Sequence, residues 1–458
     1  MFFHHFYDTR LAQASYLVGC QATGNALVID PNRDLAPYAA VAAEHGLRIT
    51  HVTETHIHAD FLSGARELAA RHGAQLLLSG EGGPDWQYAF AADAGATLLH
   101  DGDAFMVGNL RVEVLHTPGH TPEHLCFLLT DTPRSPEPVM LFTGDFVFVG
   151  DVGRPDLLEK AAKQAGTMEA GARQLWRSLE RFRALPDHLQ LWPGHGAGSA
   201  CGKALGAVPS STVGYEKRVN WGVATREEDR FVAMVLEGQP EPPAYFAQMK
   251  RRNREGPAPV GALAPLSALD DATAEALLAA GATLLDLRPA SAFATRHHRG
   301  AVNVPLGKSL ANYAGSLVAY DTPIVFVCLS EREAEAARDA LRLIGLDDVR
   351  GWVAPAQLPA RAGVAQPQRS AAEARAAHDA GAYTLDVRGR AEWDAGHLPH
   401  AVLIPLPALA DRLAEIPRDR PVQVHCQSGV RSAMATSWLR AQGVDAIDVL
   451  GGWNALRV

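Results

Sequence analysis

The sequence predicts an α/β protein, and three observations along its 458 residues lead to that class. Short apolar runs of strand length alternate with helix-length segments through most of the chain. A polar stretch at 250–261, which contains Arg, Gly and Pro, breaks the periodicity and is typical of a linker. Beyond it, one pattern of strands and helices occurs twice. We therefore expect a larger first domain followed by a smaller domain in two copies.

The duplication is visible in matched segments that occur in the same order. Residues 284–288 (LLDLR) recur as 384–388 (TLDVR), and residues 301–305 (AVNVP) recur as 401–405 (AVLIP). Each copy alternates short apolar strands with helices, which predicts a parallel sheet covered by helices on both faces. The predicted boundaries are 1–248 for the first domain, 249–262 for the linker, and 263–362 and 363–458 for the two copies.

Composition and charge exclude several classes of function. The chain is 47% hydrophobic and 20% charged, as in ordinary soluble globular proteins. A net charge of −9 without a Lys/Arg-rich run argues against nucleic-acid binding. No apolar stretch reaches the roughly 20 residues of a membrane span. We expect neither a nucleic-acid nor a membrane partner, and we expect a homo-oligomer.

The N-terminal residues and the cysteines indicate the compartment. Residues 1–8 are apolar but lack the basic segment and the small-residue cleavage site of a signal peptide, so we expect them to form the first strand. The five cysteines are few, odd in number and widely spread, which fits a reducing compartment. We therefore expect a cytoplasmic protein in which any role of a thiol is chemical.

Four segments of the first domain contain residue types that bind metals. Three of them end short apolar runs, namely 117–121 (TPGHT), 142–145 (FTGD) and 192–196 (WPGHG). The fourth, 55–60 (THIHAD), lies between an apolar strand and a helical pattern that ends at Gly73. One such segment would be a weak signal, but four in one domain predict a metal site. The candidate metal-site residues are His56, His58, Asp60, His120, Asp145 and His195.

These segments, in this order, resemble the metallo-β-lactamase fold, an αββα sandwich with its metal site at one sheet edge. The resemblance covers essentially all of the first domain. Hydrolytic members similar to glyoxalase II carry a His directly after the Asp of the His-x-His-x-Asp motif, where this chain has Phe61. Because a phenyl ring cannot bind a metal, the resemblance implies that the second metal site of those enzymes does not form here.

The ligand set that remains is His56, His120 and Asp145. Two imidazoles and one carboxylate with open positions suit non-haem Fe(II) that holds a substrate and oxygen together. The persulfide dioxygenase family, which this domain resembles, uses that set. The resemblance implies one Fe(2+) per chain, with His58, Asp60 and His195 orienting ligands or waters. Zinc would bind a similar triad, so the sequence leaves iron and zinc as alternatives.

Substrate contacts are assigned through the same resemblance. Residues 150–156 (GDVGRPD) resemble the segment in which the family places an Arg against the thiol carrier, which makes Arg154 a candidate substrate-binding residue. A structural salt bridge is the alternative role for Arg154. Glutathione-using relatives have an aromatic residue shortly after the last metal segment, where this chain has Gly196 and Ala197. That difference argues against glutathione as the carrier.

Three cysteines of the first domain have different predicted roles. The stretch 197–203 is similar to persulfide dioxygenase–rhodanese fusions of the CstB type, which accept persulfides such as coenzyme A persulfide. Cys201 in this stretch is therefore a candidate substrate-binding thiol near the metal. Cys20 is either a second such thiol or a small buried side chain. Cys126 lies in an apolar run and is predicted to belong to the core.

The last copy contains a loop that would activate a cysteine. Residues 425–432 (HCQSGVRS) follow a strand and lead into a helical run, so Cys426 faces backbone N–H groups and the positive end of a helix. Both lower the pKa of a thiol. Arg431 adds a charge that suits sulfite or thiosulfate oxygens, and Gly429 allows the loop to curl around the sulfur. The loop residues that we assign to substrate binding are Gln427, Ser428, Gly429 and Val430.

This loop is similar to the active-site loop of rhodaneses, which implies a sulfurtransferase that carries sulfur as a Cys426 persulfide. Only four residues separate Cys426 from Arg431, one fewer than in the Cys-x5-Arg loop of phosphatases. The first copy has Cys328 at the same place, but the residues after it, 329–334 (LSEREA), lack the Gly and the Arg. Their two carboxylates would raise the pKa of the thiol. We expect this copy to be a structural or docking domain, with a catalytic Cys328 as the alternative.

Together these sites predict an iron-dependent persulfide dioxygenase joined to a thiosulfate sulfurtransferase, with a role in sulfide detoxification. Persulfides would be oxidised with O2 to sulfite and thiol, and Cys426 would pass sulfane sulfur to sulfite to give thiosulfate. One alternative is a glyoxalase II-like zinc thioester hydrolase fused to sulfurtransferase modules. Another is a non-catalytic sulfur relay or sensor, which the complete loop at Cys426 argues against.

Overall fold

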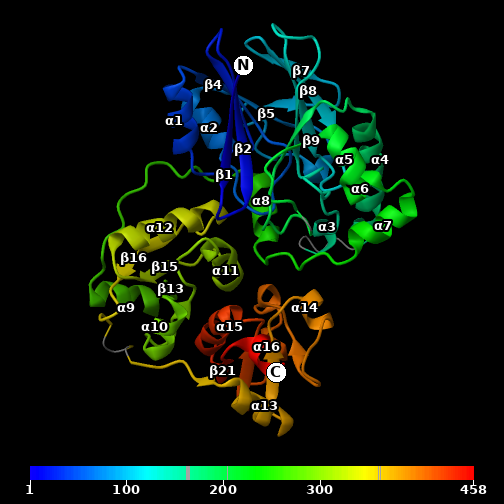
Figure 1. Cartoon of the computed structure of the whole chain (residues 1–458). Helices are drawn as coiled ribbons and strands as arrows, with labels where there is room; N and C mark the ends of the chain where they lie inside the picture. Colours follow the sequence, from blue (N-terminus) through cyan, green and yellow to red (C-terminus); the bar gives the residue numbers. More distant parts are fainter. Residues whose placement is uncertain (161–165, 204, 359–360, 362, 458) are drawn as a thin grey trace. The chain divides into compact units, whose positions relative to one another are not determined.

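Figure 1 shows the computed structural model of the chain, which describes residues 1–160, 166–203, 205–358, 361 and 363–457. By its internal contacts the chain divides into two compact units, Met1–Ala262 and Leu263–Val458. Each unit contains two β-sheets among its described residues.

The first sheet of the first unit has its strands in chain order, from β1 to β6. β1, β2 and β3 pair antiparallel, whereas β3, β4, β5 and β6 pair parallel. These strands are β1 (Phe2–Asp8), β2 (Gln13–Cys20), β3 (Asn25–Ile29), β4 (Arg48–Thr53), β5 (Gln75–Ser79) and β6 (Thr97–Leu99). The N-terminal strand that the sequence predicts is therefore confirmed.

The second sheet has the order β12-β11-β10-β9-β8-β7. Its pairs are antiparallel except for β10 and β11, which run parallel. These strands are β7 (Ala104–Val107), β8 (Leu110–His116), β9 (Leu125–Asp131), β10 (Met140–Gly144), β11 (Gln190–Pro193) and β12 (Ser211–Thr212).

Three layers of buried apolar side chains make this unit an αββα sandwich. One layer lies between the first sheet and helices α1 (Ala36–Glu44) and α2 (Ala65–His72), and a second lies between the two sheets. A third lies between the second sheet and helices α4 (Thr167–Ala184) and α7 (Glu228–Leu236). Strand β2 shows why: Leu17 contributes to the helix-side layer, while Tyr16 and Val18 contribute to the layer between the sheets. Successive side chains of a strand point to opposite faces. The fold agrees with the sandwich expected from the sequence.

The helices of the first unit lie mostly outside the two sheets. Helix α2 ends as predicted at Gly73, which adopts a left-handed conformation that suits glycine. The described helices are α1 (Ala36–Glu44), α2 (Ala65–His72), η1 (Pro84–Trp86), α3 (Leu157–Lys160), α4 (Thr167–Ala184), α5 (Val213–Val219), α6 (Trp221–Ala224), α7 (Glu228–Leu236) and α8 (Phe246–Glu255).

The second unit contains two parallel sheets, as the duplication predicts. We call the parts that carry them the middle module (263–358) and the C-terminal module (363–457). The first sheet has the order β14-β13-β15-β16 and the second has the order β17-β21-β20-β18-β19. All their pairs are parallel. The strands are β13 (Thr283–Asp286), β14 (Val302–Asn303), β15 (Ile324–Val327), β16 (Val349–Val353), β17 (Gln368–Arg369), β18 (Tyr383–Asp386), β19 (Val402–Leu403), β20 (Val422–His425) and β21 (Ala446–Val449).

Helices pack against both sheets of this unit. One hydrogen bond also joins the two modules, because the backbone N–H of Asn303 in the middle module donates to Ser437 Oγ in the C-terminal module at 2.9 Å. The described helices are α9 (Asp271–Ala279), α10 (Ala290–Thr295), α11 (Leu310–Leu317), α12 (Glu331–Leu341), η2 (Arg342–Ile344), α13 (Ala371–Asp379), α14 (Arg390–Asp394), η3 (Leu406–Ala408), η4 (Leu413–Glu415), α15 (Val430–Ala441) and α16 (Gly452–Leu456).

The stretch predicted as a linker, 249–262, differs in part from that expectation. Helix α8 continues to Glu255, and the residues up to Ala262 group with the first unit. Met249 and Asn253, four residues apart on one helix face, are buried, while Arg251 is exposed. The polar composition of the helix therefore concealed its packed face. The other predicted boundary, at 362, lies outside the described residues.

No described helix combines the length and the apolar character that crossing a membrane would require.

Candidate metal centre and thiol site

Three of the predicted ligands converge beside strand ends of the first unit. His56 follows β4, His120 follows β8, and Asp145 comes directly after β10. One ligand atom from each lies within 4.8 Å of the others. Asp145 Oδ2 is 3.9 Å from His56 Nε2 and 3.5 Å from His120 Nε2.

Two of these atoms have no hydrogen-bond partner among the described residues. All three side chains are buried, and among the described residues His56 Nε2 and Asp145 Oδ2 accept or donate no hydrogen bond. Buried polar atoms without partners are costly. Their convergence on one point therefore fits a metal ion bound by His56, His120 and Asp145.

Hydrogen bonds at Nδ1 orient both imidazoles. His120 Nδ1 donates to the backbone carbonyl of Arg154 at 3.1 Å. His56 Nδ1 lies 2.9 Å from Thr55 Oγ1, which in turn donates to Asp30 Oδ2 at 2.9 Å. A proton held at Nδ1 leaves the lone pair of Nε2 directed into the site, as a metal ligand requires.

The electrostatic environment favours the protonation states that bind metal. Burial lowers the pKa of His56 and of His120. Burial alone would raise the pKa of Asp145, but the neighbouring His195 and the two ligand histidines hold it well below its usual range. Neutral imidazoles and an ionised carboxylate are the forms that coordinate metal ions.

His195 and Asp60 lie where they can orient the carboxylate ligand. His195 Nδ1 lies 2.7 Å from Asp145 Oδ1, and its Nε2 lies 2.7 Å from Asp60 Oδ2. Burial would lower the pKa of His195, but these two carboxylates raise it well above its usual value. His58 instead faces Asp30 at 3.1 Å. Burial lowers the pKa of His58, yet Asp30 outweighs that effect and raises it to about 9.

A second group of ligand-type atoms lies beside the first. Single atoms of Asp60, His195 and Cys201 are within 4.8 Å of one another, so the structure brings Cys201 to the centre. Burial raises the pKa of the Cys201 thiol well above its usual value. Phe61, which directly follows Asp60, is fully buried, with its ring centroid 4.4 Å from that of His58.

Residues not singled out from the sequence hold the loops of the centre. Asp145 N donates to His124 Nε2 at 3.1 Å, and Ile57 N donates to Glu123 Oε1 at 2.8 Å. Glu123 and His124 lie three and four residues after His120, and this short distance along the chain could have indicated them. Asn253 Nδ2 donates to the backbone carbonyls of His58 and Phe61, at 2.7 Å each. Nothing in the local sequence of α8 indicates that contact.

Gly144 allows Asp145 to approach the centre. It has a φ of 47°, and a Cβ at this position would lie 2.5 Å from Thr55 Oγ1. Both features require glycine, because other residues are strained in the left-handed region and would collide with Thr55. The Phe-Thr-Gly-Asp pattern therefore places a carboxylate directly after a sharp bend at the strand end.

Arg154 is engaged with the protein itself. Its side chain is fully buried, and its Nε and NH2 groups donate to Asp156 at 2.8 and 2.7 Å. The guanidinium also donates to the carbonyls of Ala200 and Pro240. Through Ala200 it holds the segment that carries Cys201. These contacts favour the structural role over direct substrate contact, which stays a prediction.

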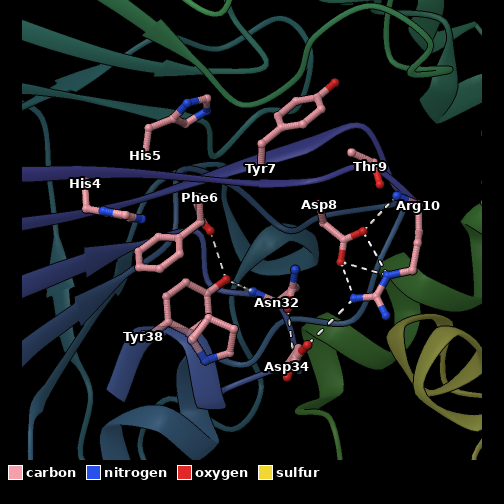
Figure 2. Close-up of a pocket in the computed structure, with 12 residues that line it drawn as sticks. His4, His5, Phe6, Tyr7, Asp8, Thr9, Arg10, Asn32, Asp34 and Tyr38 are labelled. Atoms are coloured by element: carbon pink, nitrogen blue, oxygen red, sulfur yellow. Dashed lines mark hydrogen bonds and ion pairs between the residues drawn. The ribbon is translucent and has the colours of Figure 1, made fainter. Parts of the chain in front are cut away.

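A pocket of about 440 Å³ is lined by residues of β1, the turn after it and the start of α1, and Figure 2 shows these residues. Asp8 holds Arg10 by an ion pair on one face of β1, and His5 and Tyr7 project from the opposite face (Figure 2). A Cβ at Gly196 would lie 2.9 Å from Tyr7 Oη. Tyr7 of β1 therefore lies against Gly196, the residue directly after His195.

The C-terminal module presents Cys426 between a strand and a helix. Cys426 follows β20, and α15 begins at Val430 after Gly429, which has a φ of 97°. Gly429 N donates to Cys426 Sγ at 3.2 Å. The structure thus shows the predicted loop geometry, with a backbone N–H directed at the sulfur.

Other predicted residues of the loop have distinct surroundings. Gln427 donates to Asn454 Oδ1 at 2.7 Å and accepts from Arg388 at 3.2 Å. Ser428 and Val430 are exposed. The Arg431 guanidinium donates two hydrogen bonds to a carboxylate of the same module, so its charge is paired.

The remaining cysteines are buried. Cys328 Sγ donates to the carbonyl of Ser330 at 3.4 Å, and burial raises the pKa of this thiol to about 11. Cys126 belongs to the layer under α4 and α7. Cys20 lies at the end of β2, where its sulfur accepts from Asn109 N at 3.3 Å. Neither Cys20 nor Cys328 lies in the clusters of ligand-type atoms found among the described residues.

Family models match most of the chain. Residues 8–195 match the metallo-beta-lactamase superfamily, and residues 270–351 and 370–457 match the rhodanese-like domain. A solved structure of a metallo-beta-lactamase from Staphylococcus aureus subsp. aureus COL is 45% identical and covers 77% of this chain and 99% of that chain, with a TM-score of 0.71.

Curated relatives are similar to the first unit. A hydroxyacylglutathione hydrolase of Rhodopseudomonas palustris is 30% identical over 53% of this chain and 94% of that protein. A beta-lactamase hydrolase-like protein of Xylella fastidiosa is 28% identical over 50% of this chain and 54% of that protein. The chain thus spans about half the length of the first curated relatives that it matches. Taken with the matched family model, the relatives covered almost throughout their length show that this chain belongs to the metallo-beta-lactamase superfamily and carries two rhodanese-like regions after that domain.

Proposed function

We propose that this chain is a persulfide dioxygenase joined to a sulfurtransferase. It would oxidise low-molecular-weight thiol persulfides with O2 to sulfite and thiol, and would then combine sulfite with sulfane sulfur to form thiosulfate. The observation that carries the proposal is the cluster of His56, His120 and Asp145 beside a buried Phe61. That cluster offers one metal position with three protein ligands, where hydrolytic relatives have a further histidine.

The three ligands would hold one Fe(II), which when bound supplies a centre able to bind a persulfide sulfur and O2 together. His195 keeps a proton between Asp145 and Asp60 and so holds the carboxylate ligand in one orientation. The buried side chains around the cluster exclude bulk water from the reacting sulfur.

Cys426 would perform the transfer in two displacements. Its thiolate attacks the outer sulfur of a persulfide, the sulfur–sulfur bond breaks, and the carrier leaves as a thiol. The sulfur of sulfite then attacks the outer sulfur held on Cys426, which yields thiosulfate and regenerates the thiolate. The N–H of Gly429, 3.2 Å from Cys426 Sγ, stabilises the thiolate in both steps.

We also propose a substrate class, a cellular compartment and an oligomeric state for this protein. Coenzyme A persulfide or a similar small persulfide is the carrier that we favour, with O2, sulfite and thiosulfate as the other small molecules. We propose a cytoplasmic homo-oligomer that detoxifies sulfide and has no nucleic-acid or membrane partner. The net charge of −9 supports the exclusion of nucleic acid.

Oxygen uptake by the full chain, with its metal quantified, tests the proposal. Coenzyme A persulfide and glutathione persulfide are supplied separately, and sulfite and thiosulfate are measured. We expect uptake in proportion to iron content, and loss of uptake in His120→Ala. An iron-loaded protein that consumes no O2 with either persulfide would contradict the dioxygenase.

A zinc thioester hydrolase is the second candidate. Similarity to a hydroxyacylglutathione hydrolase over 94% of that protein favours it, as does the second group of ligand-type atoms at Asp60, His195 and Cys201. Purified protein that contains zinc and hydrolyses an acyl thioester, without consuming O2, would establish this function instead.

A further inference from the structure

The positive charge of the Cys426 loop is paired with a carboxylate of the same module. Arg431 NH1 and NH2 donate to Glu392 Oε2 and Oε1 at 2.7 and 2.6 Å. Glu392 lies on α14, and its Oε2 also accepts from Gly389 N at 3.0 Å. Two parallel hydrogen bonds between a guanidinium and a carboxylate fix both groups and cancel their charges. The pair is 26% and 34% exposed and so remains accessible to a small anion.

The duplicated module provides an internal comparison. When Cys328 is matched with Cys426, Glu333 corresponds to Arg431. When Asp286 is matched with Asp386, Ala292 corresponds to Glu392. The copy that lacks the arginine therefore also lacks its carboxylate partner. Since partly exposed ion pairs contribute little to stability, the joint presence of both residues beside the complete thiol loop points to a role at that loop.

A second guanidinium that contacts the loop is also paired. Arg388, which donates to Gln427 Oε1, holds Asp386 through Nε and NH2 at 2.9 and 2.7 Å. Tyr313 of α11, in the middle module, lies close enough for the charges of Arg431, Cys426 and Glu392 to influence its pKa, which burial raises. Arg388 and Arg431 are thus both compensated by carboxylates.

We propose that Glu392 sets the charge preference of the Cys426 site: by neutralising Arg431 it disfavours loading of Cys426 from thiosulfate, a dianion, relative to loading from a thiol persulfide. This inference rests on the proposed sulfur transfer. Loading from thiosulfate is the reverse of thiosulfate formation, because the Cys426 thiolate attacks the outer sulfur and sulfite leaves with the electron pair. Weak binding of thiosulfate therefore favours release of this product over its use to reload Cys426. Sulfite is affected less, since near neutral pH part of it carries a proton.

The test measures loading of Cys426 in the full chain without O2, so that the metal centre takes no part. Thiosulfate or the persulfide of 2-mercaptoethanol, a thiol without a charged group, is the donor, and the mass gained by the Cys426 peptide reports the attached sulfur. In Glu392→Gln, which keeps an acceptor for Gly389 N, we expect the rate of loading from thiosulfate to rise about fivefold or more, as for a unit charge about 4 Å away in a water-like dielectric. Loading from the persulfide should change less than about twofold.

Glu415→Gln is the matched control. Glu415 accepts two hydrogen bonds from Arg412 at 2.7 and 2.6 Å in the same module, so this variant removes an equal charge from an equivalent pair. It should leave the ratio of the two loading rates unchanged. Glu392→Gln combined with Arg431→Gln should lose the gain, because the unmasked charge is then absent.

The outcomes separate the inference from the function on which it rests. If Glu392→Gln and Glu392→Ala both leave the ratio unchanged or lower the rate with thiosulfate, Glu392 only positions Arg431 and the inference is overturned. If wild-type Cys426 is loaded by neither donor, the sulfur transfer itself is overturned. Loading of the wild type by persulfide, with a gain for thiosulfate in the variants, supports both.

Discussion

His195 Nδ1 lies 2.7 Å from Asp145 Oδ1, while Asp145 Oδ2 faces the imidazoles of His56 and His120. The two oxygens of one carboxylate thus have different tasks. One is held by a histidine that is itself anchored on Asp60, and the other is left for a metal. Hydrogen bonds to a metal ligand from residues that do not themselves bind the metal fix the orientation of that ligand and account for part of the affinity of the site.

Asp60→Asn should weaken metal binding by about 10- to 100-fold, because it weakens the hold on His195 and thereby on Asp145. Competition with a chelator of known affinity measures the dissociation constant. Asp93→Asn, which removes the same charge from an exposed position of the first unit, is the control. An unchanged affinity in Asp60→Asn would show that His195 does not act through Asp60.

Arg154→Lys should destabilise the protein without a selective effect on substrate affinity. A lysine cannot reproduce the paired bonds to Asp156 together with those to Ala200 and Pro240. A loss of even about 1 kcal/mol corresponds to about 2–4 °C in the melting temperature of a domain of this size. The melting temperature, from differential scanning calorimetry, and KM are compared with those of Arg181→Lys, which changes an exposed arginine. A higher KM at an unchanged melting temperature would instead indicate substrate contact.

Glu123 should make the first unit less stable as pH rises from about 4.5 to about 7. Burial raises the pKa of this carboxyl from 4.5 to about 7, so in this window the folded state keeps a proton that the unfolded chain releases. The loss amounts to about 3 kcal/mol over the window. Glu123→Gln keeps an acceptor for Ile57 N and should show a flatter profile. Melting temperatures between pH 5 and pH 8, with a chelator present, measure the difference, and parallel profiles would contradict it.

Cys328 should not react with an alkylating reagent under conditions in which an activated thiol does react. With the pKa of Cys328 raised to about 11, only about a thousandth of this thiol is ionised at pH 8. Iodoacetamide at pH 8 should leave the Cys328 peptide unmodified in mass spectra. Cys328→Ser should preserve thiosulfate formation, whereas Cys426→Ser should abolish it. Equal losses in the two variants would give the middle module a catalytic thiol.

The sequence was informative wherever a feature depends on neighbouring residues. The helix stop at Gly73 and the thiol loop are each encoded within a few residues, and the duplication shows in short matched segments. Local patterns also supplied the residue types for the metal site. Composition misled only at α8, where one buried face is hidden among charged residues.

The tertiary structure decided how these local features combine. It brought one ligand atom each of His56, His120 and Asp145 within 4.8 Å of the others and turned His58 toward Asp30. It also paired Arg431 with Glu392, 39 residues away in the sequence. Hydrogen bonds and ion pairs act over about 3 Å, so partners distant along the chain are set by packing and not by local sequence. The sequence by itself determined which chemical groups this protein carries, and the packed fold determined which of them meet.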